Sequence, residues 1–164
     1  MNLYPWVVLG HVFFVIVSFM AHGVSVFAFF RVRSESDRAR LGAILDLSAT
    51  SLVTAGVTLL IAIVLGIVAA ILGGHFGRLW PWVSIGVLVV VIGAMTPLAT
   101  TPLGTVRTAL GQPGRGDKPG DPPRQPASDE ELAAARARLR PELVAGIGIG
   151  GLAVLVALME LKPF

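Results

Sequence analysis

Four long stretches of apolar residues alternate with shorter polar segments along this chain. Each stretch reaches the length of about 20 residues that a helix needs to cross the hydrocarbon core of a bilayer. Gly73 and Gly74 end the second stretch and Pro81 stands near the start of the third, as is typical of helix ends. The pattern predicts an all-α integral membrane four-helix bundle, a single transmembrane domain over residues 1–164. Its spans are expected at about residues 4–30, 44–72, 80–98 and 142–161.

The segment between the third and fourth spans, about residues 99–128, differs from the other connections. Residues 111–127 are rich in Pro and Gly and carry charge, which is typical of a mobile loop. Ser128 stands three residues before Glu131, which is the spacing of a capping box at a helix start. We therefore expect a mobile cytoplasmic loop, followed by a short cytoplasmic amphipathic helix over 129–140 that enters the fourth span at Pro141.

Basic residues are distributed unevenly between the two sides of the expected membrane. Eleven of the 13 Lys and Arg residues lie in segments 31–43 and 99–141, while only Arg78 and Lys162 lie in the other connections. Because Lys and Arg concentrate in cytoplasmic loops, both termini are expected outside a bacterial plasma membrane. Membrane lipid is the expected partner of this charge, and no nucleic acid is expected.

The composition excludes several kinds of chemistry. The chain is 54% hydrophobic and only 14% charged, and it has no Cys for disulfides, thiolate ligands or a thiol nucleophile. The spans contain no paired carboxylates, no Ser/His/Asp set and no phosphate loop, so hydrolytic or nucleophilic catalysis is unsupported. If the chain is an enzyme, we expect a haem-dependent membrane oxidoreductase.

A stripe of polar residues inside the first span is the main candidate for chemistry. The span has no charged residue but contains His11, Ser18, His22 and Ser25. On an ideal helix His22 lies roughly 20° around the axis from His11 and about 16.5 Å along it, and both serines share this face. An ionisable residue in a membrane span is by default a functional-site hypothesis.

Two histidines at two membrane depths are typical of b-type cytochromes, in which imidazole ligates haem iron and His or Met completes the coordination. We therefore expect His11 and His22 to provide one axial ligand each to haem b and to pass electrons. Met95 lies at the expected depth of His22, and His75 lies toward the side of His11. The sixth ligands would come from His75, Met95 or a second protomer, and Arg78 is expected to pair with a haem propionate.

Other interpretations remain open from the residues alone. Membrane histidines and serines also form structural hydrogen bonds between helices. The two histidines of the first span are also compatible with a path for protons. A cofactor-free accessory or scaffold subunit of a larger membrane complex is the second hypothesis, and copper handling by His and Met is the third. Gly146-x-x-x-Gly150 predicts close helix packing, within the chain or in a homodimer. Asp46 is expected to pair with Arg38 or Arg40.

Residues 9–48 also carry a resemblance to known proteins. Its features are His11, the Ala21-His22-Gly23 step and an Arg-rich segment followed by Leu45-Asp46-Leu47-Ser48. This quarter of the chain resembles a family of small, uncharacterised bacterial four-helix membrane proteins. More distantly, it is similar to the copper-resistance D proteins and to the four-helix membrane protoporphyrinogen oxidase. The resemblance implies a helical bundle that holds haem b or handles copper, with His11 as a ligand.

Overall fold

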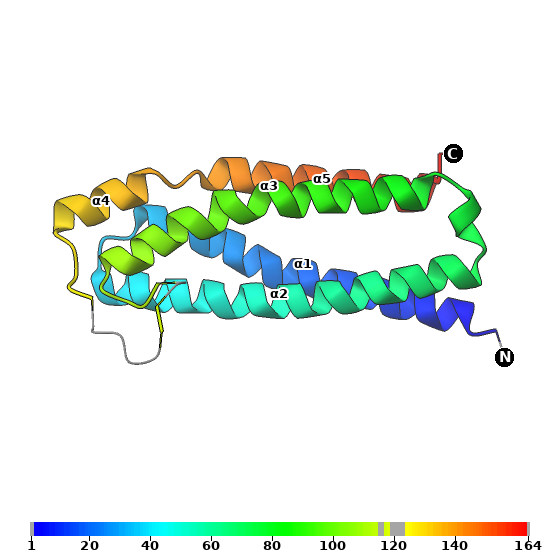
Figure 1. Cartoon of the computed structure of the whole chain (residues 1–164), viewed down its shortest axis with the longest axis horizontal. Coiled ribbons are helices and arrows are strands. Elements are labelled where there is room, and N and C mark those ends of the chain that lie inside the picture. Colours follow the sequence, from blue (N-terminus) through cyan, green and yellow to red (C-terminus); the bar gives the residue numbers. More distant parts are fainter. Residues whose placement is uncertain (1, 115–116, 119–123, 164) are drawn as a thin grey trace.

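The computed structural model describes residues 2–114, 117–118 and 124–163. These residues form helices and connections with no strand among them, which confirms the all-α prediction. The first three long helices and the α4–α5 segment are each long and apolar enough to cross a membrane. The elements in Figure 1 are α1 (Tyr4–Ser34), α2 (Arg38–Leu72), the 3-10 turn η1 (His75–Gly77), α3 (Trp80–Ala109), α4 (Asp129–Ala137) and α5 (Pro141–Leu161).

Three helices extend beyond the apolar stretches that predicted them, and the first of these, α1, continues past residue 30 to Ser34. Helix α2 begins at Arg38, because the Asp37 carboxylate accepts a hydrogen bond of 2.8 Å from the Arg40 backbone N–H and caps the helix start. Helix α3 continues through Pro97 and Pro102 to Ala109. The loop predicted from about residue 99 is therefore wrong up to Ala109, since hydropathy falls before the helix ends. The rest of that prediction lies partly on residues 115–116 and 119–123, outside the described residues.

The long helices are arranged as two pairs, α1 with α2 and α3 with α5 (Figure 1). Helices α1 and α2 pack against each other along their length, whereas contacts between the two pairs are few. Both chain termini lie at one end of the molecule, which we call the terminal end. The opposite end contains the α1–α2 turn, the last turns of α3, and α4; we call it the basic end.

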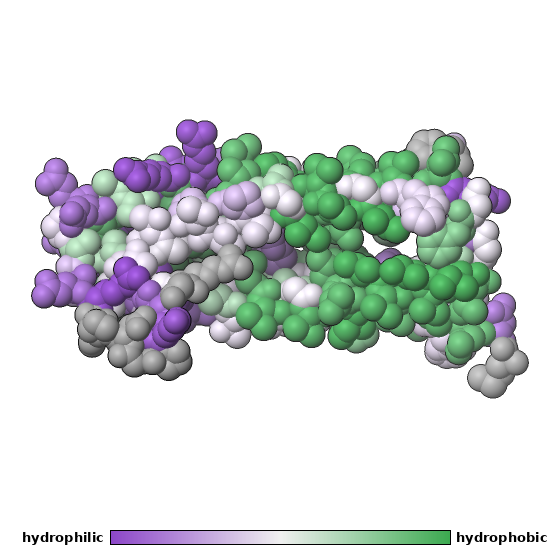
Figure 2. Space-filling model, in the orientation of Figure 1, coloured by the Kyte–Doolittle hydropathy of each residue, from purple (hydrophilic) through white to green (hydrophobic). Residues whose placement is uncertain are grey.

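The basic end holds the largest group of buried apolar side chains. All five helices contribute to this core, in which Val32, Leu41 and Leu139 are almost completely buried. Three ion pairs surround it: Arg33–Glu142 at 2.7 Å, and Arg38–Asp129 and Arg107–Asp46 at 2.6 Å each. Figure 2 shows most of the hydrophilic residues gathered at this end, a largely apolar surface over the middle of the visible face, and a few hydrophilic residues at the terminal end.

Three predictions about the basic end can be compared directly with the structure. The capping box is confirmed: the Ser128 hydroxyl accepts from the Glu131 N–H, and the Glu131 carboxylate accepts from the Ser128 N–H. The helix that it starts ends at Ala137, before the expected residue 140. The expected partner of Asp46 was wrong, because the longer α3 brings Arg107 to that carboxylate.

Candidate cofactor site between the helix pairs

A seam of polar contacts with a seven-residue spacing joins α1 to α2. His11 Nδ1 lies 2.7 Å from the Ala62 carbonyl oxygen, and the Ser18 hydroxyl donates to the Ala55 carbonyl at 2.9 Å. The third contact joins the hydroxyls of Ser25 and Ser48 at 2.8 Å. A seven-residue repeat keeps one helix face against its partner over a long distance. These three polar residues of α1 therefore make the interhelical hydrogen bonds that the structural interpretation predicted.

The hydrogen bond of His11 also determines what its other ring nitrogen offers. A carbonyl oxygen only accepts, so Nδ1 must carry a proton to form the bond with Ala62. In a neutral ring, Nε2 then has a free lone pair. A histidine that ligates a metal usually donates its other N–H in this way. The missing Cβ of Gly66 makes room for the ring, since a Cβ there would lie 2.9 Å from two of its atoms.

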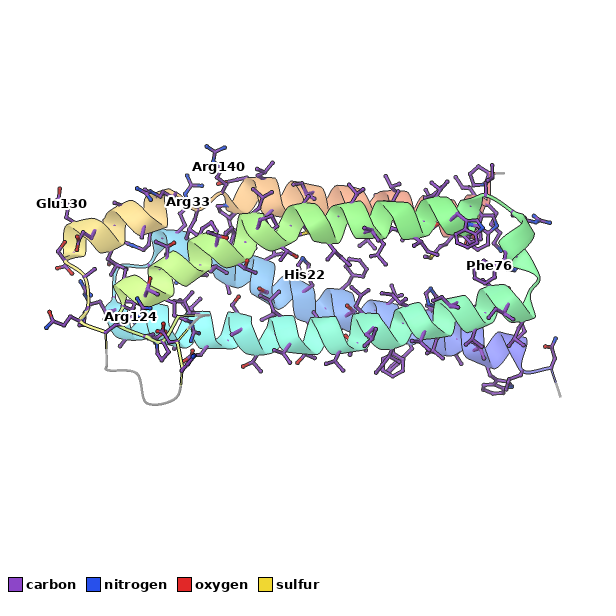
Figure 3. The ribbon with its side chains drawn as sticks, in the orientation of Figure 1. His22, Arg33, Phe76, Arg124, Glu130 and Arg140 are labelled. Carbon is purple, nitrogen blue, oxygen red and sulfur yellow. The ribbon has the colours of Figure 1, made fainter. Side chains whose placement is uncertain are left out.

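His22 has different neighbours from those of His11. Its Nε2 lies 3.7 Å from the position that a Cβ would take at Gly148 of α5, and Met95 Sδ of α3 lies 3.6 Å from that same point. Side chains from α1 and α3 thus meet beside a glycine of α5. Figure 3 places His22 near the middle of the long axis. The structure therefore brings together His22 and Met95, which the sequence placed at one depth.

Two glycines of α5 allow this close approach. A Cβ at Gly151 would lie 2.5 Å from Val91 Cγ2 of α3, and a Cβ at Gly148 would lie 3.2 Å from Met95 Cε. At Gly146 and Gly150, by contrast, an added Cβ meets no atom of the described residues within 4 Å. Packing inside the chain therefore uses a different pair of glycines from the predicted Gly146-x-x-x-Gly150. The homodimer alternative for that motif remains a prediction.

The remaining candidates lie apart from His22. His75 Nε2 is 3.2 Å from the Tyr4 hydroxyl oxygen at the terminal end. It approaches Gly73, while His11 approaches Gly66, so the two imidazoles lie roughly 10 Å apart along α2 at 1.5 Å per residue. Arg78 follows η1 and is exposed. Eighteen residues of α1, roughly 27 Å, separate the level of Tyr4 from His22, so Arg78 cannot serve a group held at His22.

The donor set at His22 can be tested against the expected cofactors. One imidazole nitrogen and one thioether sulfur form a known axial pair for haem iron, and both atoms also suit Cu(I). Both atoms lie within 3.7 Å of the position that a Cβ would take at Gly148. Within the described ranges, no three His, Asp or Glu side chains group as a metal site. The residues thus fit an iron or copper centre of two protein ligands better than a carboxylate-rich metal site.

Two cavities lie at the basic end, away from these residues. One of about 260 Å³ lies between α2 and α3 and is lined by Leu45, Leu52, Leu103 and Arg107 among others. The other, of about 600 Å³, is open and lies between α3, α4 and residues 124–127. Among the residues described, neither cavity is lined by His or Met. The site at His22 is therefore separate from both cavities.

Sequence reasoning missed the role of Gly148, because five small residues within 146–153 gave no reason to prefer one helix face. The depth of Met95 did indicate its neighbour, His22. Comparison with protein-family models, curated proteins and solved structures finds no match to this chain.

Proposed function

We propose that this chain is a four-span protein of the bacterial plasma membrane, with both termini outside, that binds one haem b and passes electrons. His22 and Met95 would be the two axial ligands. The observation that carries the proposal is their meeting beside Gly148, three residues contributed by three different helices. The resemblance of residues 9–48 favours haem or copper in general, but it implies His11 as the ligand, so the pair of His22 and Met95 rests on the contacts at Gly148.

The chain's own residues have defined tasks in this proposal. His22 and Met95 hold the iron, and Gly148 leaves the space that a side chain would occupy. His11, through Ala62, fixes α1 against α2 and so fixes the height of His22 relative to α3 and α5. When bound, haem supplies one-electron oxidation and reduction, with a potential raised by a Met ligand. The proposal is for one haem rather than two, because His75 bonds to Tyr4 and lies far from His11 along α2.

The haem content of three variants tests this proposal. His22→Ala should lose most of the haem measured by pyridine haemochrome, and Met95→Leu should keep haem with an altered reduced spectrum. Met159→Leu is the matched control, because Met159 is exposed on α5, away from His22. The proposal is wrong if His22→Ala keeps full haem content. Copper that follows His22 and Met95 in metal analysis of the same samples would instead indicate copper handling.

The cofactor-free accessory subunit is the second candidate, and one observation favours it. Each hydrogen bond of the α1 seam is satisfied within the α1–α2 pair, while Gly146 and Gly150 face no described residue. A colourless chain that copurifies with a stoichiometric partner from native membranes in mild detergent would support this function. Copurification of a coloured chain alone would contradict it.

A further inference from the structure

The larger cavity of the basic end has no part in the proposed haem site. Its volume is about 600 Å³, which lies within the range of roughly 300–1,000 Å³ that is usual for small-molecule sites. Three parts of the chain line it: α3 with Thr108, α4 with Ala134 and Arg138, and residues 124–127. We call it the α3–α4 cavity.

Backbone hydrogen bonds hold the walls of this cavity in place. The Ala127 N–H donates to the Ala109 carbonyl at 2.9 Å, and the Ala127 carbonyl accepts from Arg38 Nη2 at 2.7 Å. These two bonds fix residues 124–127 against the ends of α3 and α2. The carbonyls of residues 106–108 accept from the N–H groups of residues 110–112. The last carbonyls of α3 are therefore paired, which reduces the negative charge that this helix end presents to the cavity.

The charged residues of the lining favour an anion at one part of the α3–α4 cavity. Arg138 is exposed, and its guanidinium forms no hydrogen bond or ion pair with the part of the chain that the structure describes. Arg124 also lines the cavity and is oriented by hydrogen bonds of 2.5 and 2.8 Å to Asp117. Glu131 is the acidic residue among those described in the lining, and its carboxylate accepts from the Ser128 N–H at the start of α4. Because Glu131 lies seven residues, or roughly 10 Å, from Arg138 along the chain, an anion belongs beside Arg138.

We propose that the α3–α4 cavity binds a phosphate ester, with the phosphate group at Arg138 and Arg124. A guanidinium group matches the geometry of phosphate oxygens and forms paired hydrogen bonds with them. The small side chains of Ala134 and Thr108 leave room for the organic part of the ester. The phosphate would come either from the headgroup of an anionic phospholipid at the cytoplasmic surface or from a soluble phosphate ester. This inference goes beyond the proposed function and does not require haem, so a colourless chain would leave it intact.

The direct experiment is a calorimetric titration of the full chain in dodecyl maltoside, a detergent without phosphate. The probes are dihexanoyl phosphatidylglycerol, glycerol 3-phosphate and dihexanoylglycerol, which lacks phosphate. At least one of the two phosphate probes should bind saturably at one site per chain, and dihexanoylglycerol should not. Binding of phosphatidylglycerol alone would identify a lipid headgroup as the ligand, whereas binding of glycerol 3-phosphate would identify a soluble ester. The proposal is overturned if neither phosphate probe binds, or if dihexanoylglycerol binds as well as they do.

Two neighbouring arginines provide a matched pair of variants. Arg138→Gln should weaken binding of the phosphate probe by about tenfold or more, because it removes a charged hydrogen-bond donor from the cavity. Arg140→Gln removes the same charge two residues away, from a side chain that points away from the helices (Figure 3). This control should leave the affinity unchanged. Equal losses in the two variants would show a general attraction to positive charge and would contradict the proposed site.

Two neighbouring alanines of α4 test the cavity itself without a change of charge. Ala133 and Ala134 are both exposed, but only Ala134 lines the cavity. Ala134→Leu should fill part of the space and lower the affinity for the phosphate probe by about tenfold, while Ala133→Leu should leave it unchanged. Thermal unfolding of both variants shows whether each keeps the fold. Equal affinities in two folded variants would place the ligand outside the α3–α4 cavity and overturn the proposal.

Discussion

The basic end and the terminal half of this molecule are held together in different ways. At the basic end, five helices bury a shared apolar core and three ion pairs surround it. Toward the terminal end, the helices separate into two pairs, with many large apolar side chains exposed. There each pair is held by small residues and single hydrogen bonds, as at Gly151 and Ser18.

The difference follows from the solvent that each region is proposed to meet. Burial of apolar side chains stabilises a structure only where water is the alternative. In lipid, helices associate through close packing of small residues and through interhelical hydrogen bonds. The proposed haem site lies between these regions, inward from the packed core and at the start of the looser half. A cofactor between the helix pairs would have the packed core of the basic end on one side and the loosely joined helix pairs on the other.

The largest expected effect comes from the core of the basic end. Leu139→Ala should lower the free energy of unfolding by about 2–5 kcal/mol, because Leu139 is almost fully buried. Leu60→Ala is the control: Leu60 is 62% exposed on α2. Its loss should be near zero in a denaturant titration of the chain in detergent. Similar losses at both positions would remove the distinction between the two regions.

The next effect concerns the glycines of α5. Gly151→Ala should destabilise the chain by about 1–3 kcal/mol, because its Cβ would overlap Val91. Gly150→Ala should be neutral or stabilising by up to about 1 kcal/mol, since its Cβ meets no described atom and Ala favours helices. Thermal unfolding of both variants gives the comparison. A large loss at Gly150 that depends on protein concentration would indicate a homodimer face instead.

A smaller effect is expected along the α1–α2 seam. A double-mutant cycle on Ser25→Ala and Ser48→Ala should give a coupling energy of about 0.6 kcal/mol, the average for hydrogen bonds between membrane helices. The cycle is measured from the unfolding free energies of the two single variants and the double variant. A coupling energy of zero would show that this buried contact does not hold α1 to α2.

The smallest effect is a pH dependence at the surface of the basic end. The Arg124 side chain, with the Gly114 backbone N–H, lowers the pKa of Asp117 to about 2. A lowered carboxyl pKa stabilises the folded segment above the unfolded value of about 3.9, and this contribution disappears as the pH falls toward 2. An NMR titration of the Asp117 carboxyl should show the low pKa in the wild type and a higher one in Arg124→Gln, where the Gly114 N–H still lowers it. An unchanged titration in the variant would exclude Arg124 as the cause.

Hydropathy and capping patterns were enough to predict the helices, the short α4 and its capping box. They could not predict that α3 reaches Ala109, because residues 99–109 are helical without being strongly apolar. At the site, helical spacing gave the shared face of His11, Ser18 and Ser25. It could not separate the neighbours of His11 from those of His22, since that depends on where α3 and α5 lie around α1. That Met95 lies near His22 was predicted only from the similar membrane depth of the two residues in their spans.

The most direct test of the central proposal is the reduced-minus-oxidised absorption spectrum of the wild-type chain, purified after expression with ample haem. The account predicts a sharp α-band and one haem per chain by pyridine haemochrome. A colourless chain, or haem in far less than stoichiometric amount, would contradict it. His22 and Met95 would then be packing partners, and the search for function would move to protein partners.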